Sequence, residues 1–219
     1  MQWSNTTQRA TLGGLLIAEA TYVTRQGNDG YGSPGIETDG QVVGWRRVVD
    51  AVHARGATIL LQLWHVGRVS HTSLQPDGGR PIAPSAIDAG LGTLLKDGPG
   101  AATSPREITL AEIPEIVAQY RRAAERAKVA GFDGVEIHGA NGYLIDQFLQ
   151  DGSNKRTDAY GGSIVNCARF LFEVVDAVAG VWGADRVGVR IGPSNVFNEM
   201  HDNDPKAPFS HVAAGLRDR

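Results

Sequence analysis

Apolar runs and helix-period apolar patterns alternate along most of this 219-residue chain. The compact runs predict buried strands, at residues 12–20, 57–65, 134–138 and 187–191. Apolar residues three or four positions apart predict helices among and after these runs, at residues 38–55, 109–130, 164–181 and 210–219. Because the two kinds of element alternate, we expect an α/β fold in which helices cover parallel strands.

Local signals mark the ends of two of the predicted helices. Thr38 and Gln41 have the spacing of a capping box, and Gly56 stands where a helix C-terminus favours glycine. Thr109 and Glu112 repeat the capping signal at the start of the next helix. The long segment between these helices and their strands, residues 66–107, is expected to be functional or to contain small elements of its own.

The alternation of side chains within the strands separates two folds that share this element order. In the second strand Ile59, Leu61 and Leu63 share one face, and Gln62 and Trp64 lie on the other. In the third strand Glu136 and His138 lie opposite the apolar side chains, and in the fourth strand Arg190 does so. These polar residues therefore share one face near the C-terminal ends of the strands. That arrangement favours a (β/α)8 barrel that opens on a catalytic rim over a doubly wound sheet. The doubly wound alternative is weakened further because no Gly-x-Gly-x-x-Gly follows a strand.

Composition narrows the function. The length predicts one domain, residues 1–219, and a net charge of −3 gives no reason to expect nucleic acid or an anionic membrane as partner. We find no membrane-spanning apolar run and no signal peptide, and the single cysteine, Cys167, fits a reducing cytoplasm. The spacing of His65, His71 and His201 does not predict a metal site.

The most informative segment is Gly131–Leu149, because its strand ends by presenting three polar side chains on one turn. His138 and Asn141 can both donate to one acceptor, such as a carbonyl oxygen that gains negative charge. Tyr143 is a weak acid that can protonate a strongly basic carbanion or enolate. The alternative is a core histidine with satisfied hydrogen bonds beside a loop tyrosine.

Three further residues on strands are candidates for ligand binding. Gln62 can donate and accept, which matches the imide edge of a flavin or a pyrimidine, and Trp64 offers an aromatic wall. Ordinary barrel packing explains both equally well. Arg190 can stabilise an anionic ring or bind phosphate, or it can form a structural ion pair with Glu136 or Glu19.

The chain resembles the old yellow enzymes, which are flavin-dependent ene-reductases, and within them the bacterial alkene and N-ethylmaleimide reductase type. The resemblance runs in family order along nearly the whole chain. The matching segments are Gly13–Thr21, Ser33–Gly56, Leu60–His71, Gly131–Leu149, Arg156–Ser163 and Asp185–Pro193.

The resemblance implies a barrel that binds FMN, which NAD(P)H reduces and which then passes hydride to the β-carbon of an activated alkene. His138 and Asn141 match the family's pair that binds the carbonyl or nitro oxygen, and Tyr143 matches its proton donor to the α-carbon. Gln62 matches the residue at the flavin pyrimidine edge, and Arg190 the one beside flavin N1 and O2. The resemblance also places the Ala20 backbone against the flavin and makes Trp64 a wall of the substrate pocket.

The chain departs from the family in its number of strands. Only about four of the eight barrel strands are predicted; the first strand and the last three have no counterpart. In such barrels the loops after strands seven and eight usually hold the phosphate. We therefore keep a second hypothesis beside the enzyme: a catalytically incomplete piece of such an enzyme, non-enzymatic or at most an interaction module.

Overall fold

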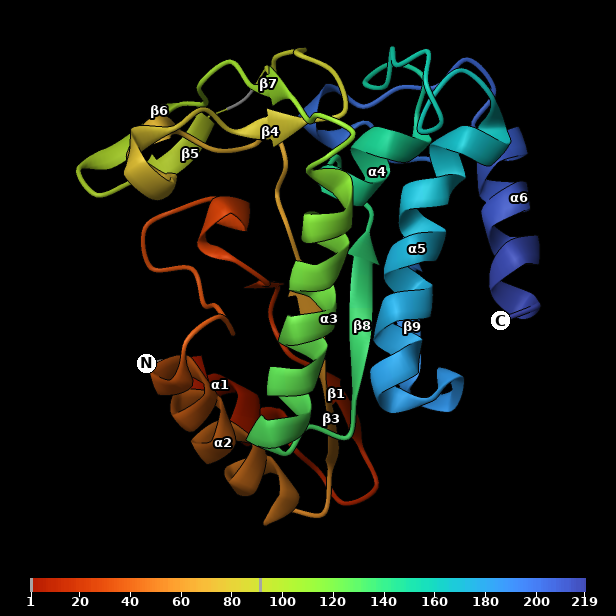
Figure 1. The fold of residues 1–219 in the computed structure, drawn as a ribbon. Helices are drawn as coiled ribbons and strands as arrows, with labels where there is room; N and C mark the ends of the chain where they lie inside the picture. The colour runs from red at the N-terminus through yellow and green to blue at the C-terminus, as the bar shows by residue number, and fades with distance from the viewer. Residues whose placement is uncertain (1, 91) are drawn as a thin grey trace.

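A five-stranded, wholly parallel sheet forms the centre of the molecule. The computed structural model describes residues 2–90 and 92–219 (Figure 1). The strand order is β1 (Leu15–Ile17), β3 (Thr58–Trp64), β8 (Gly134–Gly139) and β9 (Val187–Ile191), and β2 (Thr21–Tyr22) pairs with the end of β3. Since β1 and β2 run along the same neighbour, the sheet has four strand positions, which confirms the predicted half of a β/α barrel.

Helices cover one face of this sheet: in Figure 1 α3 and α5 lie in front of the strands, and α2 packs next to α3 and β3. The helices are α1 (Gln2–Arg9), α2 (Asp39–His53), α3 (Ile113–Ala130), α4 (Leu144–Leu149), α5 (Ile164–Trp182) and α6 (Lys206–Arg217). Beneath them the predicted apolar face is confirmed, because Ile59, Leu61, Leu63, Val135 and Ile137 are each 0% exposed. The opposite face, which a closed barrel turns inward, carries the polar side chains.

Helix ends follow the predicted signals in part. The capping box before α2 is confirmed, with Gln41 N donating to Thr38 Oγ1 (3.3 Å) and Thr38 N donating to Gln41 Oε1 (2.9 Å). The predicted start of α3 at Thr109 is wrong, because the helix begins at Ile113. The Glu112 carboxylate accepts from the Thr109 N–H and from Arg106, so these residues form a separate turn before the helix.

The predicted first strand, residues 12–20, is also only partly regular. Residues 18–20 lie opposite just two residues of β3, Leu61 and Gln62, so the chain contains one extra residue, as in a β-bulge. The bulge separates β1 from β2 and contains Ala20. At the other end of the chain α6 begins at Lys206, four residues before the predicted Ser210, and α1 lies where no element was predicted.

The long segment after β3 contains small elements, as expected. Two short sheets form there, β4 (Ile82–Ala83) with β7 (Arg106–Glu107) and the hairpin β5 (Gly92–Leu95) with β6 (Gly98–Ala101). Single 3-10 turns complete the structure, at Arg25–Gly27, Thr72–Leu74, Pro76–Gly78, Ala184–Arg186 and Phe197–Glu199. In Figure 1 these small sheets gather with α4 at the end to which β8 points. The C-terminal rim of the half-barrel is therefore its most elaborated part.

One buried cation fastens two parts of this rim. The side chain of Arg156 is 2% exposed and donates to the carbonyl oxygens of Pro84 (3.1 Å) and Ile108 (2.6 Å). Its other nitrogens donate to the Asp158 carboxylate, at 3.1 and 2.6 Å. The loop between α4 and α5 is thereby tied to the segment that contains β4 and β7.

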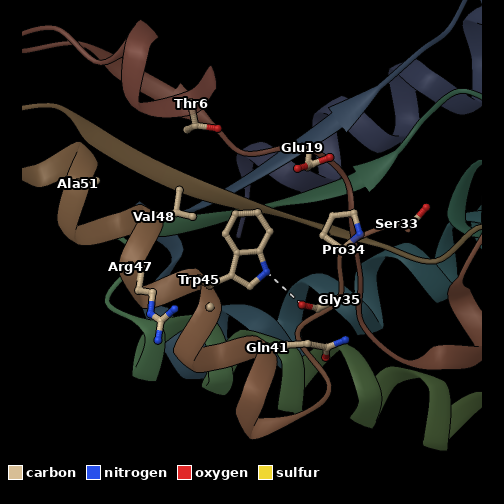
Figure 2. A pocket seen from close by; sticks show the side chains of 11 residues that line it. Thr6, Glu19, Ser33, Pro34, Gly35, Gln41, Trp45, Arg47, Val48 and Ala51 are labelled. Carbon is tan, nitrogen blue, oxygen red and sulfur yellow. Dashed lines mark hydrogen bonds between the residues drawn. The ribbon is translucent and has the colours of Figure 1, made fainter. Parts of the chain in front are cut away.

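The sheet has two open edges among the described residues, at β1 and at β9. Beside the β1 edge lies a cavity of 620 Å³ between α2 and the loop at residues 33–35. Figure 2 shows the indole of Trp45 in this cavity, with Glu19 and Pro34 across from it. Trp45 Nε1 donates to the Gly35 carbonyl (3.0 Å), so the ring is held in place. A closed barrel places a further strand along such an edge.

Among the residues described, every helix is too short or too polar to cross a membrane.

Two side chains of α4 hold the turn that follows β8. Asp146, 0% exposed, accepts from the Gly142 N–H and from Gln150 Nε2, both at 2.8 Å. Gln147, also 0% exposed, donates to the carbonyl oxygens of Gly142 (2.7 Å) and Val66 (3.0 Å). Both groups to which Gln147 donates are backbone carbonyls, one in the turn and one in the segment after β3. Gln147 therefore fixes these two segments relative to each other.

Replacing Asp146 by Asn should change how stability depends on pH. Burial raises the pKa of Asp146 from 3.8 to about 6. The folded protein therefore holds this proton more tightly than the unfolded chain, and the contribution of Asp146 to the free energy of unfolding falls by about 3 kcal/mol as pH rises from 4 to 6. Asp146→Asn stays neutral and should lose that much less stability over this range, measured by urea denaturation at pH 4, 5, 6 and 7. The exposed control Asp77→Asn should follow the wild type, and parallel curves for all three proteins contradict the prediction.

Candidate active site

The strand register brings the polar residues of β3, β8 and β9 together on the inward face. Gln62 lies opposite Glu136 in the β3–β8 pair, and His138 lies opposite Arg190 in the β8–β9 pair. Partners across a parallel pair project to the same face. Since all three strands run the same way, these residues form two adjacent rows near the C-terminal ends of the strands.

The structure places His138, Tyr143 and Trp64 in one aromatic cluster above these rows. The ring centroids of His138 and Tyr143 are 5.3 Å apart, and those of Trp64 and Tyr143 are 4.9 Å apart at an interplanar angle of 84°. Edge-to-face packing at this spacing is favourable for aromatic rings. Ala20, in the bulge after β1, packs against the same cluster from the other side.

Asn141 joins the cluster from the turn between β8 and α4. Its φ of +60° is left-handed, a conformation that asparagine tolerates better than most residues. Asn195 Nδ2 donates to Asn141 Oδ1 (3.2 Å), and Asn198 Nδ2 donates to its backbone carbonyl (2.7 Å). With its side-chain oxygen already accepting, Asn141 keeps its amide N–H groups as the donors of this side chain.

Burial sets the protonation of the two titratable groups in the cluster. It lowers the pKa of His138 to about 4, and the positive charge of Arg190 adds to the effect. It raises the pKa of Tyr143 to about 12, assisted by the negative charge of Asp29 and opposed by a hydrogen bond with Asn198. At neutral pH the imidazole is therefore neutral and the phenol keeps its proton.

Two buried donors of the cluster have no hydrogen-bond partner within the described residues. They are His138 Nδ1 and Trp64 Nε1. An unpaired buried polar atom costs free energy, and native proteins keep few of them. His138 is 3% exposed, so the structure argues against the alternative of a core histidine with both nitrogens satisfied. A neutral histidine with a free ring nitrogen can hold a ligand oxygen.

Gln62 and Arg190 extend the inward face beside the cluster. Gln62 Nε2 donates to Glu136 Oε1 (2.5 Å), so the partner of the amide is a carboxylate and not a backbone group. Arg190 is exposed, and in the described structure it forms no ion pair with Glu136. Its guanidinium is therefore open to solvent on the face that also carries Glu136.

These residues fit the ring of FMN. An arginine without a direct ion-pair partner suits a ring that becomes anionic on reduction, and the Gln62 carbonyl oxygen is left to accept from an imide N–H. Ala20 contributes a small side chain where a flat ring needs close approach. The phosphate of FMN has a different requirement, because β/α barrels usually hold it on loops after strands seven and eight. The described sheet has four strand positions, so its residues fit the ring end of the cofactor only.

Several residues near Tyr143 were not predicted from the sequence. A cavity of 360 Å³ is lined by Tyr143 together with Asp29, Thr93, Phe197 and Asn198. These four come from the loop after β2, from β5 and from the segment after β9. In the sequence, the one indication that Phe197 and Asn198 belong to the site is their position shortly after β9, the strand that contains Arg190. Within the described parts of the chain, no three His, Cys, Asp or Glu side chains are grouped so as to hold a metal ion.

Buried Arg68 anchors the segment after β9 over the site. It is 2% exposed, and its guanidinium donates to the Asn198 carbonyl (2.8 Å) and to the Ile87 carbonyl (3.4 Å). A fixed cation on two carbonyls holds both segments without any regular pairing. The wall of the cavity that Asn198 contributes is therefore positioned by the segment after β3.

Comparison with known proteins gives a consistent family. The model of the NADH:flavin oxidoreductase / NADH oxidase family matches residues 2–218. The chain is 53% identical over 201 residues to 12-oxophytodienoate reductase 7 of Oryza sativa subsp. japonica, which covers 90% of this chain and 51% of the relative. It is 48% identical over 209 residues to flavin oxidoreductase hxnT of Emericella nidulans, covering 95% of this chain and 53% of the relative.

Solved structures agree with the sequence relatives. The structure of morphinone reductase in complex with tetrahydroNAD superposes with a TM-score of 0.94 at 49% identity, over 98% of this chain and 61% of that chain. The chain thus spans little more than half the length of the proteins it matches. The family match over almost all of its residues shows that the chain belongs to the NADH:flavin oxidoreductase / NADH oxidase family, the old yellow enzymes.

Proposed function

We propose that this chain carries the substrate side of an FMN-dependent NAD(P)H:alkene oxidoreductase. The substrate is an α,β-unsaturated carbonyl or nitro compound, which gains hydride at its β-carbon and a proton at its α-carbon. FMN, once reduced by NAD(P)H, supplies the hydride. The observation that carries the proposal is the approach of the His138 and Tyr143 rings to 5.3 Å at the end of β8, with His138 Nδ1 unpaired in the described structure and Asn141 in the turn between them.

His138 and Asn141 bind and polarise the activating oxygen. When the β-carbon accepts a hydride, negative charge develops on that oxygen and on the α-carbon. Two neutral donors placed in advance stabilise this charge without reorganising, which lowers the barrier. The depressed pKa of His138 keeps it neutral, so it donates a hydrogen bond and not a full proton.

Tyr143 delivers the proton to the α-carbon. Its pKa, raised to about 12, keeps the phenol protonated at neutral pH and leaves it acidic enough for a carbanion-like carbon. Trp64, packed edge-to-face on the phenol ring, limits its rotation. Asn198, whose side chain opposes the rise in this pKa, lines the same cavity as Tyr143.

Gln62, Arg190 and Ala20 are the residues that we assign to the FMN ring. The relatives support the nicotinamide reductant, because the matched morphinone reductase is in complex with tetrahydroNAD. The names of the rice relatives, as 12-oxophytodienoate reductases, support an activated alkene as substrate. The single cysteine, Cys167, supports a reducing cytoplasm as its location, and the net charge of −3 supports a small-molecule partner over nucleic acid.

A second candidate is a catalytically incomplete piece of such an enzyme, at most an interaction module. The observations that favour it are the exposure of Arg190 and the two sheet edges that lack a partner among the described residues. An exposed arginine holds an anion weakly, because water and salt screen it. The two candidates differ in whether these 219 residues retain the cofactor.

We expect the isolated chain to purify without yellow colour and to bind FMN weakly. Its sheet offers the ring contacts of Gln62 and Arg190, whereas a barrel's phosphate loops follow later strands. Flavin absorbance after gel filtration measures retention, and titration of flavin fluorescence measures the weak binding. Arg190→Ala should weaken binding further, whereas Arg186→Ala, at the opposite end of β9, should not. Stoichiometric flavin that survives gel filtration contradicts this prediction.

Tyr143→Phe should slow alkene reduction and leave reduction of the flavin by NAD(P)H unchanged. The variant keeps the ring packing but loses the proton, and general acid catalysis contributes about 100-fold or more. The test uses residues 1–219 joined to the remaining segments of morphinone reductase, with the two half-reactions followed separately by stopped flow. Tyr160→Phe, whose hydroxyl bonds Glu173, is the matched control. Equal losses in both half-reactions contradict the role of Tyr143 as proton donor.

A further inference from the structure

The cavity that Tyr143 lines has two further polar residues, Asp29 and Thr93, on adjacent segments, and we call this part its polar end. Val69, Leu94 and Phe197 add apolar side chains to its lining. Its volume of 360 Å³ lies near the lower limit of ligand pockets, which are roughly 300–1,000 Å³. A single ring with one substituent fits this volume.

Asp29 provides the acceptor at the polar end. Ser33 Oγ donates to Asp29 Oδ1 at 2.6 Å, so one carboxylate oxygen is held and the side chain is fixed. No lysine, arginine or histidine is among the described residues that line the cavity. A carboxylate that faces a cavity without a cation accepts hydrogen bonds from a ligand and repels a ligand anion.

Thr93 provides an independent observation at the same end. The residue is 8% exposed, and its Oγ1 is buried with no hydrogen-bond partner in the described structure. Thr93 lies in β5, whereas Asp29 lies in the loop after β2, so the two reach the cavity from separate segments. A buried hydroxyl without a partner is costly, and a ligand that hydrogen-bonds to it recovers that cost.

We propose that this cavity takes an activated alkene whose ring carries a neutral hydrogen-bond donor, a hydroxyl or an amide N–H, and that Asp29 and Thr93 bind that substituent. The inference rests on the proposed function, because it takes Tyr143, which lines the cavity, as the proton donor and the neighbouring His138, with Asn141, as the partners of the activating oxygen. Asp29 accepts from the donor, and the Thr93 hydroxyl bonds the same group. A carboxylate-bearing ring is rejected, since Asp29 repels it and no cation on the described wall compensates.

The test compares three probes with the 219-residue chain by saturation-transfer NMR: cyclohex-2-enone, its 4-hydroxymethyl derivative and its 4-carboxylate. We expect the hydroxymethyl ring to bind about tenfold more tightly than the carboxylate, because one hydrogen bond and one charge repulsion separate them. Asp29→Asn should reduce this ratio to about threefold or less by removing the repulsion. Thr93→Val, which keeps shape and loses the hydroxyl, should weaken only the hydroxymethyl ring. Asp97→Asn, an exposed change in the turn of the same hairpin, should behave as wild type.

The outcomes separate this inference from the proposed function. Equal affinity of the wild type for all three rings, or an unchanged ratio in Asp29→Asn, overturns the inference alone. His138→Gln should weaken all three rings alike, since each presents the same carbonyl oxygen. Failure of every ring to bind, or no effect of His138→Gln on rings that do bind, overturns the proposed function and the inference with it.

Discussion

The parallel pairing of β3 with β8 is the contact on which the rest of the structure depends. It places Gln62 opposite Glu136. Two residues further along each strand, it brings Trp64 and His138 to the same rim. On the helix side it buries apolar side chains completely; on the inner side it aligns polar ones. A shift of one residue reverses these faces, because side chains alternate along a strand. Packing beneath the helices and chemistry at the rim therefore rely on one register.

The rim adds a second constraint, since its backbone is irregular and much of it is buried. Buried backbone groups need partners, and here side chains supply them. Asp146 and Gln147 bind the turn at Gly142, Arg156 binds two carbonyl groups of the segment after β3, and Arg68 binds the segment after β9. Burying each of these polar side chains costs free energy, which its hydrogen bonds offset. Each of them connects segments that no sheet pairing joins. The active-site turn is thus rigid because its polar groups are saturated, while the ligand-facing donors beside it are not.

Whether a feature could be predicted from the sequence depends on how far apart in the chain its interacting residues lie. The main strands and the long helices α2, α3 and α5 were predictable because their apolar periods are local, whereas α1 and α4 were not predicted. The pairing of His138 with Tyr143 was predictable because polar residues follow one buried strand. The bulge at Ala20 was not, since it depends on how many residues of β3 lie opposite. Asp29, Thr93 and Asn198 were missed because their neighbourhood forms between distant segments; the bond from Arg68 to Asn198 joins residues 130 positions apart. No local pattern records such a contact.

Burial divides the inner face into two regions with different chemistry. Around His138 and Tyr143 it is deep enough to move both pKa values away from neutrality in opposite directions, which leaves two neutral donors. Arg190, one strand away, stays exposed and keeps its charge where a cofactor ring fits. The charge still reaches the imidazole and lowers its pKa, so the cofactor side of the face helps to keep the substrate side neutral. An anion beside Arg190 offsets part of that influence. The charge of Arg190 therefore acts on both regions of the inner face.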